Sequence, residues 1–214
     1  MTVNQLIRPW RATGFGKLRV GNPKGDGGYV MLDDLARVAM AISAGIGNDV
    51  SWDLDIAERG IDVVQVDPYV RAPPVPHHRF RFFQDRMSFA GALYQCPALG
   101  WLILKIDVEG DEWRLIGGAQ ADELKRMAQL IVEFHGFADA DQGVLAKLDA
   151  AFRPVHVHGN NYGPVIGGFP DTVEVTYASR ERYRFEPGTS AYPTPLDRPN
   201  DPAHPDLALR WQQP

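Results

Sequence analysis

Short apolar runs alternate with amphipathic stretches along this chain from residue 38 to residue 177. Residues 101–106 (WLILKI) and 129–134 (QLIVEF) are nearly continuous apolar runs, which is typical of strands buried on both faces of a sheet. Residues 52–59 lie between the shorter apolar runs at 38–43 and 63–66. They place apolar side chains on one side and charged ones between them, as an amphipathic helix does. This alternation predicts an α/β fold with a mostly parallel sheet and helices on both faces.

The same patterns give the extent of each expected element. Strands are expected at 38–43, 63–66, 78–83, 101–106, 129–134, 155–158 and 173–177. Helices are expected at 52–59, 88–94, 111–125 and 139–152. Before them, two apolar runs around a turn rich in Gly, Asn, Pro and Asp predict a hairpin over 18–32. Because right-handed crossovers bring the carboxyl ends of parallel strands to one edge, the residues just after each strand are the candidate site residues.

The chain divides into three parts on these patterns. Residues 1–37 form an N-terminal segment with the hairpin, residues 38–185 one α/β domain, and residues 186–214 a proline-rich extended arm. Seven of the 17 prolines lie in this arm, beyond the last strand, where they do not interrupt the sheet. Trp211 is a candidate anchor for the arm, on its own domain or on a neighbouring subunit, and a disordered arm is the alternative.

Composition argues against several classes of protein. With 22 Lys and Arg residues against 27 Asp and Glu residues, the net charge is −5, which argues against nucleic acid as a partner. No apolar run approaches the roughly 18 residues of a membrane-spanning helix, and the first residues lack the apolar core of a signal peptide. The single cysteine, Cys96, cannot form an internal disulfide. We therefore expect a cytoplasmic location and no membrane span.

A glycine turn follows the first strand of the α/β domain. Gly45 and Gly47 permit a tight turn and a close approach of the backbone to a ligand. The second strand ends in Asp67, twenty residues after Gly47, where a carboxylate can bind ribose hydroxyls as in dinucleotide sites. Each feature also has a purely structural use, as a strand-to-helix turn or as a cap before Pro68. Together they indicate an adenosine-containing ligand.

The residues after the glycine turn distinguish two adenosine ligands. A nicotinamide dinucleotide fingerprint has a third small residue where this chain has Val50, and Asp49 places negative charge where a pyrophosphate would lie. S-adenosylmethionine has no phosphate and carries a sulfonium and an amino group, so an acid near the turn suits it. The pattern therefore favours S-adenosylmethionine over NAD.

Acidic residues and a histidine follow the later strands. Asp107 and Glu109 alternate onto one side after the fourth strand, and Glu133 ends the next one, close to Asp107 if these strands are adjacent and parallel. Oxygen ligands from two neighbouring strand ends could hold Mg²⁺, and His135 lies on the side of Glu133 as a base or ligand. An acidic helix N-terminus is the alternative explanation, but it accounts poorly for Asp107.

A loop bounded by glycines follows the strand expected at 155–158. His158, Asn160 and Asn161 in this loop could hydrogen-bond a polyhydroxylated substrate. A lone histidine more often has a structural role, but acids and histidines that converge from several strand ends favour a functional site.

Several of these segments together resemble the FkbM-like methyltransferases. Residues 105–110 (KIDVEG) are similar to that family's K-I-D-V/I-E-G motif, and residues 43–51 (SAGIGNDVS) to its S-x-G-I-G-N-D-x-S cofactor loop. Residues 26–30 (DGGYV), 133–135 (EFH) and 158–161 (HGNN) look like further signals of the family. The resemblance runs from about residue 18 to residue 178; KIDVEG is fairly specific, whereas the glycine loop alone is not.

The resemblance implies a single class I, Rossmann-like methyltransferase fold with a mostly parallel seven-stranded sheet and S-adenosylmethionine as cofactor. Its acceptors are often hydroxyl groups of sugars or polyketides. Carried over to this chain, Asp67 would bind the ribose and Asp85 the adenine amino group. The full expected set of cofactor-binding residues is Tyr29, Ser43, Gly45, Gly47, Asn48, Asp49, Asp67 and Asp85.

The expected reaction is O-methylation of a hydroxyl on a carbohydrate-like small molecule or glycan. The expected residues are Asp107, His135 and His158 for catalysis, Asp107 and Glu133 for an assisting Mg²⁺, and Glu109, Asn160 and Asn161 for the substrate. An NAD-dependent oxidoreductase and a non-catalytic adenosine-ligand binding protein are the alternatives.

Only about 40 residues precede the cofactor loop, so no large N-terminal cap domain is expected. The acceptor must then be held by the strand-end loops, the hairpin, the C-terminal arm or a partner subunit, and the small size is compatible with a homodimer.

Overall fold

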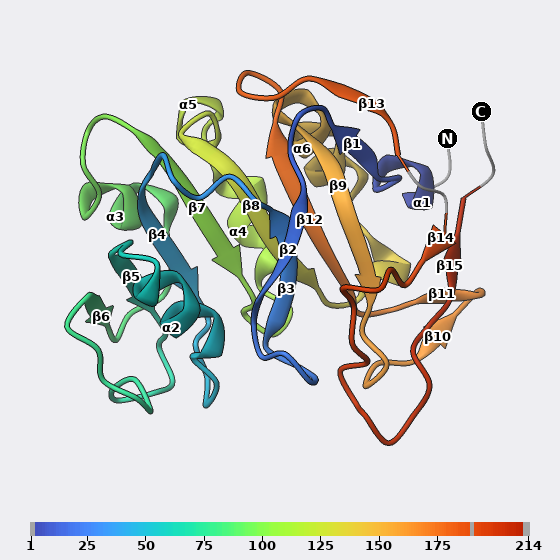
Figure 1. The fold of residues 1–214 in the computed structure, drawn as a ribbon, viewed down its shortest axis with the longest axis horizontal. Coiled ribbons are helices and arrows are strands. Elements are labelled where there is room, and N and C mark those ends of the chain that lie inside the picture. Colours follow the sequence, from blue (N-terminus) through green and yellow to red (C-terminus); the bar gives the residue numbers. More distant parts are fainter. Residues whose placement is uncertain (1–2, 189–190, 212–214) are drawn as a thin grey trace.

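The computed structural model describes residues 3–188 and 191–211, and its largest unit is a seven-stranded sheet (Figure 1). Across the sheet the strands are β6 (Phe80–Phe83), β5 (Val63–Val66), β4 (Val38–Ala44), β7 (Trp101–Ile106), β8 (Met127–Phe134), β12 (Val173–Ser179) and β9 (Phe152–Gly159). In this sheet β12 runs antiparallel to both neighbours, and the other neighbouring pairs are parallel. The expected α/β architecture, Rossmann-like and mostly parallel, is therefore confirmed.

Both faces of the sheet carry helices, as expected. One face packs against α3 (Phe89–Tyr94), α4 (Glu112–Gly118), α5 (Ala121–Leu124) and α6 (Gln142–Ala151). The other face packs against α2 (Ser51–Glu58) and against a hairpin of β2 (Lys17–Gly21) and β3 (Gly28–Leu32), which lie on one side of the sheet in Figure 1. The buried indole of Trp52 joins α2 to the hairpin and donates its N–H to Sδ of Met31 at 3.3 Å.

The helix expected over 111–125 is instead two helices, α4 and α5. Helix α4 ends in two glycines, and glycine costs about 1 kcal/mol relative to alanine inside a helix. Ala119 then takes an extended conformation, and α5 begins after Gln120, whose backbone N–H donates to the Glu123 carboxylate at 2.7 Å. None of the described helices is long and apolar enough to span a membrane.

Three short strand pairs are not predicted by the sequence patterns. They are β1 (Trp10–Ala12) with β13 (Phe185–Pro187), β10 (Val165–Ile166) with β11 (Phe169–Pro170), and β14 (Ala191–Tyr192) with β15 (Leu209–Arg210). Two further short helices are α1 (Val3–Leu6) and the 3-10 helix η1 (Phe137–Asp139). Strands of two or three residues carry no readable alternation, so local patterns miss them. The partners β1 and β13 also lie near opposite ends of the chain.

The C-terminal arm packs against its own chain over its described residues. Tyr192, Leu209 and Trp211 belong to the main hydrophobic core, and the Trp211 indole donates its N–H to the carbonyl of Asn4 at 2.8 Å. Pro214, which the sequence assigns to the arm, lies outside the described residues. The three-part division of the chain stays a prediction.

The strand order fixes where a ligand can bind. The chain passes from β4 to β5 on one side of β4, and returns to place β7 on its other side. In open α/β sheets the crevice at such a reversal, outside the carboxyl ends of the strands, is the usual ligand site. The glycine turn after β4 and Asp107 after β7 flank this crevice.

Candidate active site

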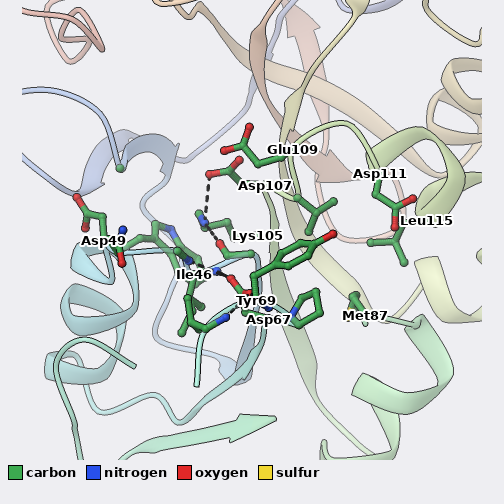
Figure 2. Close-up of a pocket in the computed structure, with 18 of the residues that line it drawn as sticks. Ile46, Asp49, Asp67, Tyr69, Met87, Lys105, Asp107, Glu109, Asp111 and Leu115 are labelled. Carbon is green, nitrogen blue, oxygen red and sulfur yellow. Dashed lines mark hydrogen bonds and ion pairs between the residues drawn. The ribbon is translucent and has the colours of Figure 1, made fainter. Parts of the chain in front are cut away.

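A cavity of about 300 Å³ opens at the carboxyl ends of β4, β5 and β7. Figure 2 shows Asp49 at the left of this cavity, Asp107 and Glu109 at its upper centre, and Tyr69 below them. The expected site residues that line it are Tyr29, Gly45, Gly47, Asn48, Asp49, Asp67, Asp107 and Glu109. Its size is at the lower end for small-molecule sites.

The glycine turn is packed directly against the end of β7. Gly45 has φ +76°, and a Cβ at this position would lie 1.6 Å from the carbonyl oxygen of Asp107. Glycine is therefore required here both for its conformation and for the close approach of the two backbones. Gly47 has φ +48° but open space around the position of a Cβ, so its requirement is conformational only.

Asp67 is bound by backbone N–H groups on both carboxylate oxygens. Oδ2 accepts from Ile46 and Gly47 at 3.0 Å each, and Oδ1 accepts from Tyr69 and Val70 at 2.7 and 3.2 Å. Burial favours the neutral acid, but the four N–H groups outweigh it and hold the pKa of Asp67 below its usual value. Asp67 thus joins the glycine turn to the loop after β5 and fixes the wall of the cavity where the sequence places a ribose.

A buried polar row lies beneath the glycine turn. Gln65, Ser43 and Lys105 are neighbours across β5, β4 and β7. Asp53 of α2 accepts from the Gln65 amide at 2.8 Å and from the Ser43 hydroxyl at 3.3 Å. Ser43, expected to bind the cofactor, is therefore engaged under the turn and is not among the residues that line the cavity.

Lys105 joins the two halves of the site. Its ammonium donates to the carbonyl of Gly45 at 2.8 Å and lies 3.6 Å from Oδ2 of Asp107, although the residue is 4% exposed. The hydroxyl of Tyr29 donates to the same Asp107 oxygen at 3.0 Å. Lys105 was not among the expected site residues, and a lysine inside an otherwise apolar strand is the signal that identifies it.

Glu133 is buried among other carboxylates. One oxygen or nitrogen from each of Asp107, Glu133 and His135 lies within 4.8 Å of the others, and the same holds for Asp26, Glu133 and Glu174. Burial and the nearby carboxylates, Asp107 first among them, raise the pKa of Glu133 well above its usual value.

The first of these groups has the donors for a divalent cation. Two carboxylates suit Mg²⁺, and an added imidazole is acceptable to metals such as Mn²⁺ and Zn²⁺. The residues expected to hold a metal therefore fit one.

His135 faces the carboxylates with one ring nitrogen and is held by the other. Nδ1 lies 3.1 Å from Oε1 of Glu112, and Nε2 lies 3.4 Å from Glu109 and 3.7 Å from Glu133. Burial lowers the pKa of His135, but the Glu112 hydrogen bond and the surrounding carboxylates outweigh burial and raise it. Glu112 is fully buried and also accepts a hydrogen bond from the backbone N–H of Val108. It therefore orients the His135 ring, a role that the interpretation of Glu112 as part of an acidic helix N-terminus missed.

His158 is a structural cation in this fold, and its expected catalytic role does not fit its surroundings. The buried ring contacts Glu174 through Nδ1 at 3.0 Å and Asp206 through Nε2 at 2.9 Å. Burial opposes its charge, but the two carboxylates raise the pKa of His158 to about 10. A protonated ring with both nitrogens engaged has no site to accept a proton from a substrate.

The remaining expected residues lie beside the cavity. Asn160 donates to Oε1 of Glu133 at 2.8 Å, so it supports the carboxylate cluster. The Asn161 amide binds the backbone of the C-terminal arm, donating to the carbonyl of Asp201 at 3.0 Å. Asp85 is exposed and lines a smaller cavity by α3, which shares Arg86 and Met87 with the main one.

Two solved structures align with the chain at low similarity. One, described as "Putative hemolysin from Streptococcus thermophilus", is 12% identical over 78% of this chain and 63% of that chain, with a TM-score of 0.40. The other, magnesium protoporphyrin IX methyltransferase from Synechocystis PCC 6803 with bound SAM, is 16% identical over 68% of this chain and 72% of that chain, with a TM-score of 0.34. The chain thus spans less than two thirds of the first structure.

No family model and no curated protein matches the sequence. At these TM-scores neither structural likeness assigns a family, a ligand or a reaction to this chain.

Replacing Gly45 and Gly47 separately by alanine tests the packing of the glycine turn. Both have positive φ, but Gly45 also lacks space for a Cβ. We expect Gly47→Ala to lower the free energy of unfolding by about 1 kcal/mol, and Gly45→Ala to lower it by about 3 kcal/mol or more. Urea denaturation measures both values, and equal losses would contradict the close contact with Asp107.

The charge of His158 predicts a stability that falls with rising pH. Its pKa is about 10 in the folded chain and near 6.5 when unfolded, so the folded state holds a proton that the unfolded state releases between these values. We expect the resulting stabilisation, on the order of a few kcal/mol, to be complete below about pH 6.5 and lost as pH rises through 10.

Urea denaturation of the wild type and His158→Gln at pH 6, 8 and 10 checks this. The difference in unfolding free energy between the two proteins should shrink towards pH 10. A constant difference would show that His158 is neutral in the folded chain.

Proposed function

We propose that this chain is an S-adenosylmethionine-dependent methyltransferase that acts on a hydroxyl of a carbohydrate-like small molecule or glycan. The observation that carries the proposal is the shared cavity at the strand-order reversal. The glycine turn and Asp67 form one wall of this cavity, and Asp107 lies in the other. A cofactor lying along the turn would therefore bring its reactive end towards a carboxylate.

Charge in the cavity supports S-adenosylmethionine over a dinucleotide. Asp49 lines the cavity directly after the turn, and its carboxylate accepts the backbone N–H of Ser51 at 2.7 Å. A pyrophosphate at this end of α2 would face that negative charge, which removes the usual advantage of a helix N-terminus for phosphate. The ammonium and sulfonium groups of S-adenosylmethionine would be attracted instead.

Methyl transfer needs an aligned and activated hydroxyl. The hydroxyl oxygen attacks the methyl carbon in line, the carbon–sulfur bond breaks, and sulfur leaves as the thioether of S-adenosylhomocysteine. In the proposed reaction the hydroxyl binds at Asp107, and its proton passes to Nε2 of His135. Glu112 holds Nδ1 of that ring and makes it a stronger base.

Asp107 and Glu133 would hold a divalent cation in this proposal, which leaves Nε2 of His135 to accept the proton. Such a cation lowers the pKa of a bound hydroxyl. Contacts with the Tyr29 hydroxyl and the Lys105 ammonium orient Asp107, and a hydrogen bond from Asn160 orients Glu133. A cytoplasmic location and a homodimer stay part of the proposal.

Ligand-induced stabilisation tests the cofactor. S-adenosylhomocysteine at 100 times its dissociation constant should stabilise the folded chain by about 2.7 kcal/mol, seen as a raised melting temperature. NAD⁺ at the same concentration should have no effect. Stabilisation by NAD⁺ alone would favour the oxidoreductase, and stabilisation by S-adenosylhomocysteine without any methyl transfer would favour the non-catalytic binding protein.

Separate loss of Asp107 and Asp67 tests the division of roles. We expect Asp107→Asn to lower kcat by roughly 10²–10⁴-fold while S-adenosylmethionine binding stays within a few-fold. Asp67→Asn should chiefly weaken cofactor binding, because the turn loses its brace. Transfer of a tritiated methyl group to methyl glycosides of glucose, rhamnose and fucose, with calorimetry for the cofactor, measures both.

Asp122→Asn is the control. The Asp122 side chain is 95% exposed and forms an ion pair with Lys125, which is not a site residue. Equal and mild effects of the Asp107 and Asp67 variants would contradict the assignment. Full activity after EDTA treatment would remove the metal from the mechanism.

A further inference from the structure

The turn of the β2–β3 hairpin meets the C-terminal arm next to the cavity. The Asn200 amide donates to Oδ1 of Asp26, in the hairpin turn, at 2.9 Å and to Oε1 of Glu174, in β12, at 2.6 Å. Asn200 is 3% exposed. Asp26, Asn200 and Glu174 are called the clasp below. In Figure 1 the hairpin turn and the arm both lie at the edge where the parallel strands end.

The arm presents Asn200 on a fixed backbone. The next residue, Asp201, donates its N–H to Oδ1 of Asn161 at 2.7 Å, and Asp206 binds the buried ring of His158 at 2.9 Å. On the hairpin side, a Cβ on Gly25 would lie 3.4 Å from the carbonyl oxygen of Asn200. Contacts from the arm and from the hairpin therefore both fix the Asn200 amide. Such support is expected of a residue that positions another side chain.

Asp26 is the member of the clasp that reaches the proposed site. It lines the main cavity, and a carboxylate oxygen of Asp26 lies within 4.8 Å of oxygens of Glu133 and Glu174. Glu133 is in turn within the same distance of Asp107 and His135. Asp26 is thus one carboxylate away from the groups proposed to activate the hydroxyl.

The amide of Asn200 explains how Asp26 and Glu174 can lie together. Two carboxylates at this separation repel, and the Asn200 amide, which donates to both, lowers that cost. The ring of His158, 3.0 Å from Oε2 of Glu174, places a positive charge beside that carboxylate. Asp26 has no such cation among its contacts in residues 3–188 and 191–211, and it is exposed towards the cavity, so its second oxygen is available to a ligand.

We propose that Asp26 binds a second hydroxyl of the acceptor and that Asn200 is the positioning residue that holds this carboxylate in place. The proposal rests on the proposed function and adds a substrate requirement, namely an acceptor with at least two hydroxyl groups. A carboxylate suits such a ligand because it accepts hydrogen bonds without donating any. It also gives the arm, more than 170 residues beyond the hairpin turn, a positioning role at the acceptor site of its own chain.

Four variants test this with methyl α-D-glucopyranoside as the acceptor probe: Asp26→Asn, Asn200→Ala, Asn200→Asp and, as the control, His204→Ala. Asp26→Asn keeps an oxygen for Asn200 to bind but removes the charge, so it tests the acceptor contact without opening the clasp. Asn200→Asp keeps the shape and removes the donor. The His204 side chain lies in the same part of the arm and is 71% exposed.

For Asp26→Asn and both Asn200 variants we expect the KM for the glycoside to rise at least tenfold. Calorimetry should give a dissociation constant for S-adenosylmethionine within twofold of the wild type, and kcat should change by less than KM. Hydrogen exchange in residues 22–28 should rise in the Asn200 variants and stay unchanged in Asp26→Asn and His204→Ala.

An unchanged KM in Asp26→Asn overturns the proposal even if the Asn200 variants fail to fold. Unchanged exchange in residues 22–28 of folded Asn200→Ala overturns the clasp. A wild-type chain that binds no S-adenosylmethionine refutes the proposed function itself. One that binds it but methylates no glycoside refutes the carbohydrate acceptor, and the role of Asp26 with it.

Discussion

The contact between the backbones of Gly45 and Asp107 is the constraint on which the site depends. It brings the end of β4 against the end of β7 so closely that no side chain fits between them. Backbone hydrogen bonds from Gly45 to Val66 and from Asp107 to Ala44, at 2.9 and 3.0 Å, hold the three strand ends in line. The cavity, the turn that shapes it and the carboxylate opposite all follow from this arrangement.

Buried charge is balanced by specific partners around this contact. Lys105 offsets Asp107, and His158 offsets Glu174. Glu133 lies directly across from Glu174 in the sheet, and burial together with the carboxylates of Asp107 and Glu174 raises its pKa. A row of partly compensated carboxylates at one edge of a sheet is costly for stability, and such sites are where function is commonly found.

Local patterns predicted the scaffold well because the strands and the glycine turn depend on residues close in sequence. The apolar runs at 101–106 and 129–134 and the turn at Gly45 are features of this kind. Several partners of the site residues lie 40 or more residues away in the sequence, which periodicity does not report. Asp206 next to His158 and Asn200 next to Asp26 are the clearest cases, and the first of them changes the expected role of the histidine.

A crystal structure of the chain with S-adenosylhomocysteine tests the central claim most directly. The account predicts the ligand along residues 45–49, with the ribose at the loop that Asp67 braces and the sulfur facing Asp107. A ligand bound outside this cavity, or an empty cavity in crystals grown at millimolar ligand, would contradict it.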